Sequence, residues 1–327
     1  MNTIKNIFIL LIVALPTSFL AQNGNKYGET ENDSILCTEA LSVYISYYQQ
    51  KDYSEAYQQW EKACDLCPDS VQEALYQKGA NILKNEIKDA DQAGDETRKA
   101  VLIDSLMWVY DMRMELFPST TKNPKNRCHV LGWAASDFYK FNKDSAEVAF
   151  EMFKESIECL EAESSAAVLS GYYVTSFYTM KAINKIDKEA GLVRKAGMLT
   201  DYLMLMEYCN TAIAVAEEAG EERDLKGYTR AKANIEKTFI AIAQCDDMVP
   251  VLQASVESDP ENFELKKKVL SLLTNRECTE NELFLPVATA IYDQEPSAKA
   301  AYAIGMSYAK LSKLIESFDY MGGCISL

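Results

Sequence analysis

Histidine is almost absent from this chain, and glycine and proline are scarce. One histidine, His129, occurs among 327 residues, together with 13 glycines and 8 prolines. Because catalytic triads and many metal-dependent hydrolases use histidine, any such chemistry would have to involve His129. The sequence also lacks a glycine-rich phosphate loop, a paired-histidine zinc helix and a Gly-x-Ser-x-Gly turn. These gaps disfavour the common enzyme classes, and we predict that the protein is not an enzyme.

Runs of alternating apolar and polar residues, the pattern of a strand, are missing as well. Hydrophobic residues nevertheless make up 48% of the chain, which is enough for an extensive core. Many apolar residues and few helix-breaking ones are typical of long helices joined by short turns. Because about 300 residues exceed what one compact core usually holds, the sequence predicts either two domains or an elongated stack of repeats.

No apolar run in the sequence is long enough for a membrane-spanning helix, which needs roughly 20 residues. The run at residues 7–15 follows Lys5 and precedes Pro16 and a short stretch that ends at Ala21. This order is typical of a secretory signal peptide. We therefore expect residues 1–21 to be removed and the mature protein to be soluble in a periplasm or cell envelope.

Basic residues are fewer than acidic ones. Lysine and arginine number 33 against 49 aspartates and glutamates, which gives a formal net charge of -16. Because such a charge repels phosphate backbones and anionic lipid head groups, we expect no nucleic-acid partner. The acidic residues either attract a basic partner or form solvated helix faces that keep the protein soluble.

A pattern of small and aromatic residues is present at residues 37–70. Ala56, Trp60 and Ala63 lie at successive turns of an expected helix that ends at Pro68. Small residues let two antiparallel helices approach, a ring fills the space between successive pairs, and proline stops the second helix. The pattern predicts helical hairpins in which no pair is stable without its neighbour.

Weaker copies of this pattern follow, interrupted by two long expected helices at residues 188–220 and 222–244. The small residue of a first helix is Gly79, Gly132, Gly171 and Gly305 in successive copies, and Tyr308 follows the last of them. We expect a flexible polar leader at 22–34 and a single solenoid at 35–327, with regular repeats near 37–70 and 262–327 and divergent units in 71–245.

Taken together, these residues resemble the tetratricopeptide repeat family. The order of features, with Tyr47, Trp60 and Cys67-Pro68 early in the chain, is similar to that of exported repeat proteins of Bacteroidota. The resemblance implies an all-α superhelical solenoid of antiparallel hairpins. It also implies a protein-binding scaffold that holds a protein or peptide partner in a concave groove, with no catalysis and no cofactor.

The resemblance also implies which residues line that groove, because the family uses fixed positions on the first helix of each hairpin. In this sequence those positions hold Leu41, Ile45, Tyr48, Tyr76, His129, Trp133, Tyr172, Tyr302 and Met306. Aromatic rings dominate the set, and they offer a large contact area at little cost in rotamer freedom. The set favours an extended, partly apolar or basic peptide. Alternatively, the two long central helices cover part of it.

The last expected helix, from Ile315 to Leu327, contains Gly322-Gly323 and is followed by no proline or polar capping helix. A solenoid needs a capped end for solubility. We therefore expect either a truncated last repeat or self-association through this end, which leaves a self-assembling structural protein as an alternative function.

Nine cysteines in an exported chain favour disulfides, although an odd number leaves at least one unpaired. In the repeat register Cys37 begins a first helix and Cys67 ends its partner, with Cys64 as a competitor. Cys245 and Cys278 lie near the turns of neighbouring units. We consider the pairs Cys37–Cys67 and Cys245–Cys278, with buried free thiols as the alternative.

Cys64 and Cys67 also have the spacing of a redox dithiol or of half a zinc site. A redox dithiol needs the N-terminal end of a helix, whereas this pair closes one, and no second pair supplies the other zinc ligands. We expect no metal site. A thiol enzyme using Cys64 and Cys67, or another enzyme using His129, remains the alternative to a scaffold.

Overall fold

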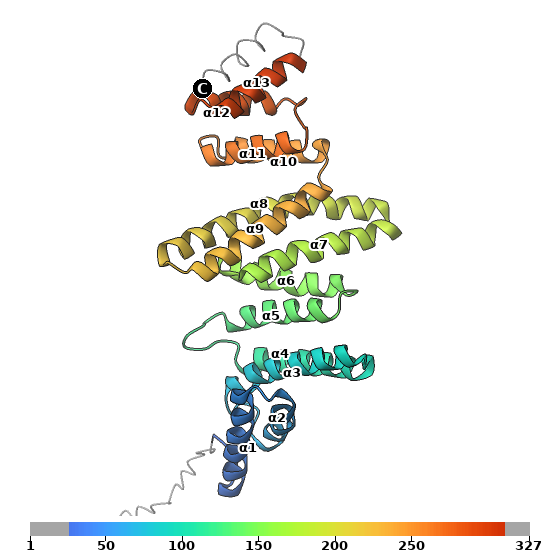
Figure 1. The fold of residues 1–327 in the computed structure, drawn as a ribbon, viewed down its shortest axis with the longest axis vertical. Helices are drawn as coiled ribbons and strands as arrows, with labels where there is room; N and C mark the ends of the chain where they lie inside the picture. The colour runs from blue at the N-terminus through green and yellow to red at the C-terminus, as the bar shows by residue number, and fades with distance from the viewer. Residues whose placement is uncertain (1–25, 311–327) are drawn as a thin grey trace, which may run out of the picture. The chain divides into compact units, whose positions relative to one another are not determined.

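The computed structural model describes residues 26–310, and most of them are helical (Figure 1). No β-strand occurs in that range. Thirteen α-helices and one short 3-10 helix follow each other: α1 (Glu31–Gln50), α2 (Tyr53–Leu66), α3 (Glu73–Ala93), α4 (Glu96–Leu116), α5 (Asn126–Phe141), α6 (Ala146–Leu160), η1 (Glu161–Glu163), α7 (Ala166–Ile186), α8 (Lys188–Ala219), α9 (Glu222–Ile242), α10 (Cys245–Ser258), α11 (Phe263–Asn275), α12 (Phe284–Gln294) and α13 (Ala298–Lys310).

Two predicted segments lie outside the described residues. They are the signal peptide at residues 1–21 and the truncated end of the last repeat. The predicted leader at 22–34 is described only from residue 26 onwards, and α1 already begins at Glu31. Thr30 and Asp33 form a capping box there, with the Asp33 backbone N–H 3.1 Å from the Thr30 hydroxyl. This cap starts the helix earlier than the apolar pattern indicates, because it satisfies backbone donors before the first buried residue.

The described residues fall into two compact units, one up to Lys99 and one from Ala100 onwards. In the first unit α1 and α2 form a hairpin, and α3 packs on α2. Ala56 and Ala63 on α2 are fully buried, as their small size predicts. Trp60 lies between α2 and α3, where its indole N–H donates to the Leu75 carbonyl at 3.0 Å.

The chain after Gly79 continues as two long helices. Helices α3 and α4 each have 21 residues, and a turn of two residues joins them. Gly94 closes α3 in the left-handed conformation at φ 70°, which an L side chain rarely adopts. The connection between the two helices is therefore short.

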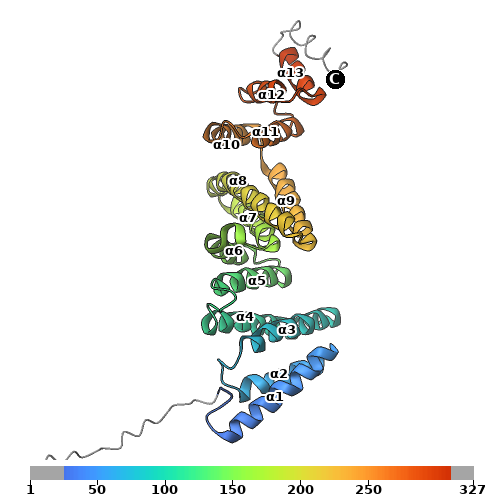
Figure 2. The same ribbon diagram turned by 90° about the vertical axis from the view of Figure 1, so that its left-hand side faces the viewer.

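The second unit is built around α7, α8 and α9, which pack against one another (Figure 2). In its core the Tyr202 ring of α8 stacks on the Phe239 ring of α9, with the ring centroids 3.9 Å apart. Tyr173 of α7 is fully buried and donates its hydroxyl to the Met198 carbonyl at 3.1 Å. Helix α6 packs on both α5 and α7, and α12 packs on both α11 and α13.

The predicted fold class is confirmed. The chain is all-α and built from antiparallel helix pairs, and the two long central helices, α8 and α9, lie where the sequence places them. Within residues 26–310, no helix is both long and apolar enough to cross a bilayer.

Candidate protein-binding surfaces

The predicted groove residues of the first unit are mostly used for packing. Leu41 and Tyr76 are buried, and the Tyr76 hydroxyl donates to the Asp69 carbonyl at 2.9 Å. Tyr48 is half-buried and accepts a hydrogen bond from the Asn81 amide at 3.2 Å. Ile45 is also half-buried. In this unit the set contributes core contacts more than open surface.

In the second unit the predicted residues are more exposed. The Trp133 indole on α5 is 39% exposed, and the Arg113 guanidinium lies 4.9 Å from its ring centroid. The His129 ring lies 6.2 Å away on the same helix. Burial lowers the pKa of His129, an effect that Glu163 partly opposes and Lys125 reinforces. A largely neutral imidazole beside an indole offers a flat aromatic contact area.

The other three predicted residues of this unit differ from one another. Tyr302 is exposed on α13 and Met306 is half-buried. Tyr172 is buried on α7, and its hydroxyl donates to the Asp201 carboxylate of α8 at 2.8 Å. The alternative of helix packing therefore applies to Tyr172, because the long helix α8 covers it.

The two cysteines with dithiol spacing do not pair with each other. Cys67 forms a disulfide with Cys37, and their Cα atoms are 4.8 Å apart. Cys64 is left as a free thiol, and burial raises its pKa to about 12, with further contributions from Asp65, Glu61 and Asp69. A thiol with so high a pKa is protonated at neutral pH and is a poor nucleophile.

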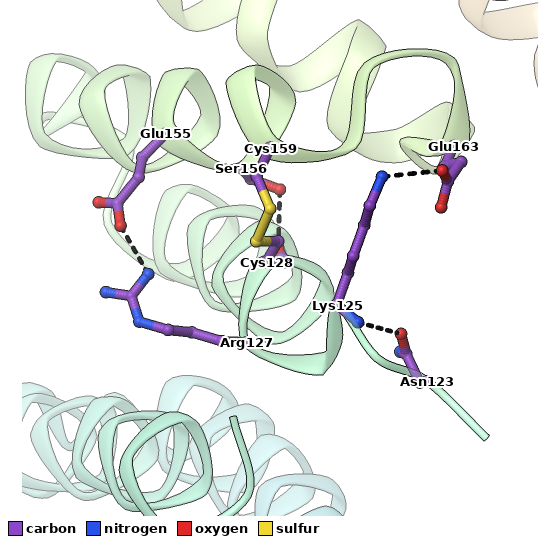
Figure 3. Close-up of a disulfide and its surroundings, with 8 residues drawn as sticks. All are labelled: Asn123, Lys125, Arg127, Cys128, Glu155, Ser156, Cys159 and Glu163. Carbon is purple, nitrogen blue, oxygen red and sulfur yellow. Dashed lines mark hydrogen bonds and ion pairs between the residues drawn. A yellow bond between two sulfur atoms is a disulfide. The ribbon is translucent and has the colours of Figure 1, made fainter. Parts of the chain in front are cut away.

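The second predicted pair, Cys245 and Cys278, is also a disulfide, with Cα atoms 5.4 Å apart. Sequence reasoning missed a third disulfide between Cys128 of α5 and Cys159 of α6 (Figure 3). The Ser156 hydroxyl donates to the Cys128 carbonyl at 2.9 Å beside this bond. The bond joins the first turn of α5 to the last turn of α6, as Cys37–Cys67 joins α1 to the end of α2.

Ion pairs flank the Cys128–Cys159 disulfide on both sides. Arg127 contacts Glu155 at 2.6 Å, and Lys125 contacts Glu163 at 2.8 Å (Figure 3). Because all four side chains are solvent-exposed, each pair contributes only about 0.2–1 kcal/mol. The disulfide is therefore the main constraint on this end of the hairpin.

An acidic surface that the sequence analysis did not single out lies on α6, η1, α7 and α8. It consists of two neighbouring hollows of about 580 and 350 Å³ that share Lys154 and Glu158. The lining residues are Glu147, Val148, Glu151, Met152, Lys154, Glu155, Ile157, Glu158, Glu161, Tyr172, Asp201, Met204 and Tyr208. Six carboxylates and one lysine occur in this set, so the surface is strongly negative.

Apolar groups lie between these carboxylates. Val148 is 53% exposed, and the Met204 and Tyr208 side chains are half-buried in the smaller hollow. Burial raises the pKa of the Tyr208 phenol, and the Glu161 and Glu207 carboxylates raise it further. The acidic surface therefore combines negative charge with exposed apolar contact area.

A partly buried polar cluster includes Asp201 and Tyr172 of the smaller hollow. The Asp201 carboxylate accepts from Tyr172 and lies 3.4 Å from an Arg194 guanidinium nitrogen. That guanidinium also hydrogen-bonds the Ser176 hydroxyl and lies 4.2 Å from the Phe150 ring centroid. Because these contacts join α6, α7 and α8, they hold the carboxylate of Asp201 in a fixed position.

The packing between hairpins shows the steric pattern that the sequence predicts. A Cβ atom added to Gly79 of α3 would lie 2.5 Å from the Trp60 ring of α2. One added to Gly171 of α7 would collide with the Phe153 ring of α6. In both cases a glycine in a first helix receives a ring from the preceding second helix. The fold is tetratricopeptide-like.

Two further repeat-defining glycines fit this tetratricopeptide-like packing. A Cβ atom on Gly132 would lie 2.7 Å from both the Ser156 hydroxyl and a Val168 methyl group. Gly305 is buried in α13, and Tyr308 packs against the core of the second unit. Pro68 follows Cys67, the C-cap of α2, as expected of a residue that stops the second helix.

No protein family matches the sequence, and no curated protein is similar to it. Solved structures with a similar course of the chain include a tetratricopeptide repeat protein from Parabacteroides merdae, at 11% identity and a TM-score of 0.39 over 89% of this chain and 93% of that one. An assembly chaperone of RpL4, Acl4, has 13% identity and a TM-score of 0.32 over 86% of this chain and 99% of that one. The tetratricopeptide domain of P58(IPK) has 13% identity and a TM-score of 0.22 over 88% and 92%. At such scores the fold assignment rests on the packing within this chain.

The glutamates of the acidic surface are visible in the sequence, but their spacing is equally typical of a helix face that only contacts water. Glu147, Glu151, Glu155 and Glu158 recur at helical spacing on α6. Sequence alone predicts a solvated face from such spacing. The structure adds that Glu158 borders a hollow to which α8 contributes Met204 and Tyr208.

Proposed function

We propose that this protein is a non-enzymatic scaffold of a periplasm or cell envelope that binds a basic and partly apolar segment of another protein. The observation that carries the proposal is the acidic surface on α6 to α8. Its carboxylates lie around hollows that also expose Val148, Met204 and Tyr208. Lysine or arginine side chains of a partner would meet carboxylates there while their apolar neighbours cover the hydrophobic floor.

Charge available for a partner supports this assignment. Glu155 is already paired with Arg127, and Asp201 with Arg194. Glu147, Glu151, Glu158 and Glu161 are exposed. Because exposed carboxylates stay hydrated until a cation replaces the water, they contribute mainly to the rate and selectivity of binding, and the apolar floor contributes most of the affinity.

Of the aromatic groove predicted from the sequence, we keep only the part around Trp133 in the proposal. Trp133, with His129 and Arg113 beside it, is the large exposed aromatic residue of that set on α5. We propose it as an additional contact for the same partner, because exposed indole rings are frequent anchors in protein interfaces.

Export and a non-catalytic role are supported by the cysteines. Three disulfides fit an oxidising compartment better than a reducing one. The pairing of Cys67 with Cys37 and the high pKa of Cys64 argue against the thiol-enzyme alternative. His129 has an aromatic neighbour in Trp133 and lies at a helix surface, which favours contact over proton transfer.

The proposal predicts that the mature protein binds an extended peptide of alternating lysine and leucine more tightly than one of alternating glutamate and leucine. The triple variant Glu151→Gln, Glu158→Gln, Glu161→Gln should weaken binding of the lysine peptide by about 3- to 150-fold, because each exposed carboxylate contributes roughly 0.2–1 kcal/mol. Fluorescence anisotropy of the labelled peptides measures both affinities.

A matched variant separates the acidic surface from the general negative charge of the chain. Glu217→Gln, Glu218→Gln, Glu222→Gln removes three exposed carboxylates near the turn between α8 and α9 and changes the net charge equally. It should bind like the wild type. Equal weakening by both triple variants would reject the acidic surface as the site.

Trp133→Ala tests the aromatic contact separately, and unchanged binding would remove Trp133 from the proposal.

A further inference from the structure

The turn between α7 and α8 carries an unusual group of exposed aliphatic side chains. Ile186 ends α7 and is 92% exposed, and Leu192 and Val193 in the second turn of α8 are 61% and 69% exposed. Water-exposed aliphatic side chains are common singly, but three within eight residues need an explanation.

Lysines surround these side chains. Lys181 and Lys185 of α7 and Lys188 of α8 are exposed. Arg194 and Lys195, further along α8, are paired with Asp201 and Asp247. The three exposed lysines nevertheless outnumber the two acidic residues of this end, Asp187 and Glu189, whereas the whole chain has a net charge of -16. Asp187 uses its carboxylate to cap α8, where it accepts from the backbone N–H groups of Glu189 and Ala190. This end of the hairpin is therefore positive on an otherwise acidic protein.

Aromatic rings lie on the same helix, α7, eight and nine residues before Ile186. The rings of Phe177 and Tyr178 are 5.3 Å apart, and the Lys181 ammonium lies 5.3 Å from the Phe177 ring. Tyr178 also approaches Tyr139 at the end of α5, over which the Lys143 ammonium lies at 4.2 Å. Neighbouring charges on that helix end are Lys140 and Asp144. Lysine and aromatic side chains together with aliphatic ones are the composition found where proteins meet a membrane interface.

The turn is also tightly built. Asp187 alone connects α7 to α8, and its backbone N–H donates to the Ile183 carbonyl at 2.8 Å. Gly191 packs so closely on α7 that an added Cβ atom would lie 2.7 Å from Cβ of Asn184. The three aliphatic side chains are thus presented by two helices in fixed positions and need no folding transition to insert.

We propose that this α7–α8 tip, formed by Ile186, Leu192 and Val193 with Lys181, Lys185 and Lys188, docks on an anionic lipid bilayer. The aliphatic groups would enter the boundary between head groups and acyl chains, and the lysines would lie at the level of the lipid phosphates. Carboxylates elsewhere on the chain oppose this approach only within the Debye length, which is about 8 Å at physiological ionic strength. The tip is a different surface from the acidic one, so this proposal does not depend on the proposed function.

Co-sedimentation of the disulfide-intact mature chain with vesicles tests the proposal. At about 0.15 M salt, we expect binding to vesicles of phosphatidylcholine and phosphatidylglycerol in equal parts and at least about tenfold weaker binding to phosphatidylcholine alone. The variant Ile186→Ser, Leu192→Ser, Val193→Ser and the variant Lys181→Gln, Lys185→Gln, Lys188→Gln should each weaken binding by at least about tenfold.

Matched controls use exposed residues far from the tip in sequence. Val101→Ser with Val215→Ser removes exposed aliphatic groups, and Lys226→Gln with Lys237→Gln and Lys299→Gln removes the same charge. Both should sediment like the wild type, and circular dichroism should show unchanged helicity in every variant. Absence of wild-type binding, or full binding by the serine variant, would overturn the proposal. Loss with the glutamine variant alone would instead indicate an acidic macromolecule, as would equal capture by immobilised polyglutamate.

Discussion

At the scale of single residues, the contact between Gly171 and Phe153 shows how the hairpins are held together. The Phe153 ring is buried against the α7 backbone at a place where any side chain would collide with it. No hydrogen bond joins the two residues, so the contact between them depends on shape. Packing of this kind is sensitive to one added methyl group, because protein interiors have little free space.

We expect Gly171→Ala to lower the free energy of unfolding by about 1–3 kcal/mol, because the new methyl group must displace the Phe153 ring. Chemical denaturation of the mature protein measures the change. Gly227→Ala is a suitable control, since its Cβ atom would lie 3.6 Å from Ala166, an ordinary contact. The control should be neutral or slightly stabilising, as alanine is the better helix former. Adding Phe153→Leu to Gly171→Ala should recover part of the loss, and strict additivity would count against the proposed collision.

Lys268 of α11 is a second residue whose position has a measurable consequence. Its side chain is only 22% exposed, and its ammonium lies 3.9 Å from the Glu236 carboxylate and 5.2 Å from the Tyr202 ring. Burial lowers the pKa of Lys268 to about 8, Glu236 opposes the shift, and the nearby Lys232 adds to it. The charged form is thus less stable in the folded protein than in the unfolded chain.

Between about pH 8 and pH 10.5, the unfolded chain retains a proton on Lys268 that the folded protein has released. The free energy of unfolding should therefore rise with pH in this window, by at most about 3 kcal/mol. Lys268→Met should be more stable than the wild type at pH 7 and should lack this contribution to the rise. Denaturation curves of both proteins at several pH values give the difference, with the exposed Lys299→Met as control. A constant difference across the window would contradict the assigned burial effect.

At the same scale, sequence reasoning identified which residues are aromatic or small but not which of them stay exposed. Ala56, Trp60 and Gly79 have the packing roles that their pattern predicts. Tyr76 and Tyr172 are buried, because exposure depends on which helix lies opposite, and that information is not local.

At the scale of helices and hairpins, the three disulfides join similar places in their helix pairs and have similar sequence separations. Cys37–Cys67 and Cys128–Cys159 each tie the start of a first helix to the end of its partner, at sequence separations of 30 and 31. Cys245–Cys278, at a separation of 33, joins the start of α10 to the segment after α11. The common separation follows from the length of two antiparallel helices and a turn, so Cys128–Cys159 could have been predicted by the same count.

Replacement of the α5–α6 disulfide by Cys128→Ser with Cys159→Ser should lower the free energy of unfolding by about 3–4 kcal/mol, as expected for a loop of this length. Cys64→Ser, which removes a thiol that forms no disulfide, should have a much smaller effect. Thiol titration of the denatured protein provides an independent check. The six cysteines of the three disulfides should react only after reduction, whereas Cys64 and Cys209 should react before it. Reaction of any of the six before reduction would contradict the pairing.

The boundaries of a helix can be predicted from the sequence where a capping residue marks them. They are harder to predict where contacts with other helices determine the length of the helix. The start of α8 and the break between α8 and α9 follow from Asp187 and Gly220, which are local caps. The length of α3 and α4 was not predictable, because helical residues beyond the repeat pattern look like an inserted loop in sequence.

At the scale of the whole molecule, net charge proved a poor guide to local surface chemistry. The value of -16 correctly indicates acidic faces such as the one on α6, yet residues 177–196 are positive. Net charge averages over the chain, whereas a partner within a Debye length responds to the nearest side chains. Both surfaces could therefore be recognised only once the positions of the helices were known.

Helix α8 has 32 residues, and this length carries a mechanical consequence. Leu192 and Val193 lie near its beginning, and Met204 and Tyr208 lie about 16 to 24 Å further along the same axis, at 1.5 Å per residue. A continuous helix behaves as a stiff rod over that distance. A bilayer bound at the α7–α8 tip would therefore fix the orientation of α8. A protein segment bound at Met204 and Tyr208 would then be held at a fixed distance and angle from the bilayer.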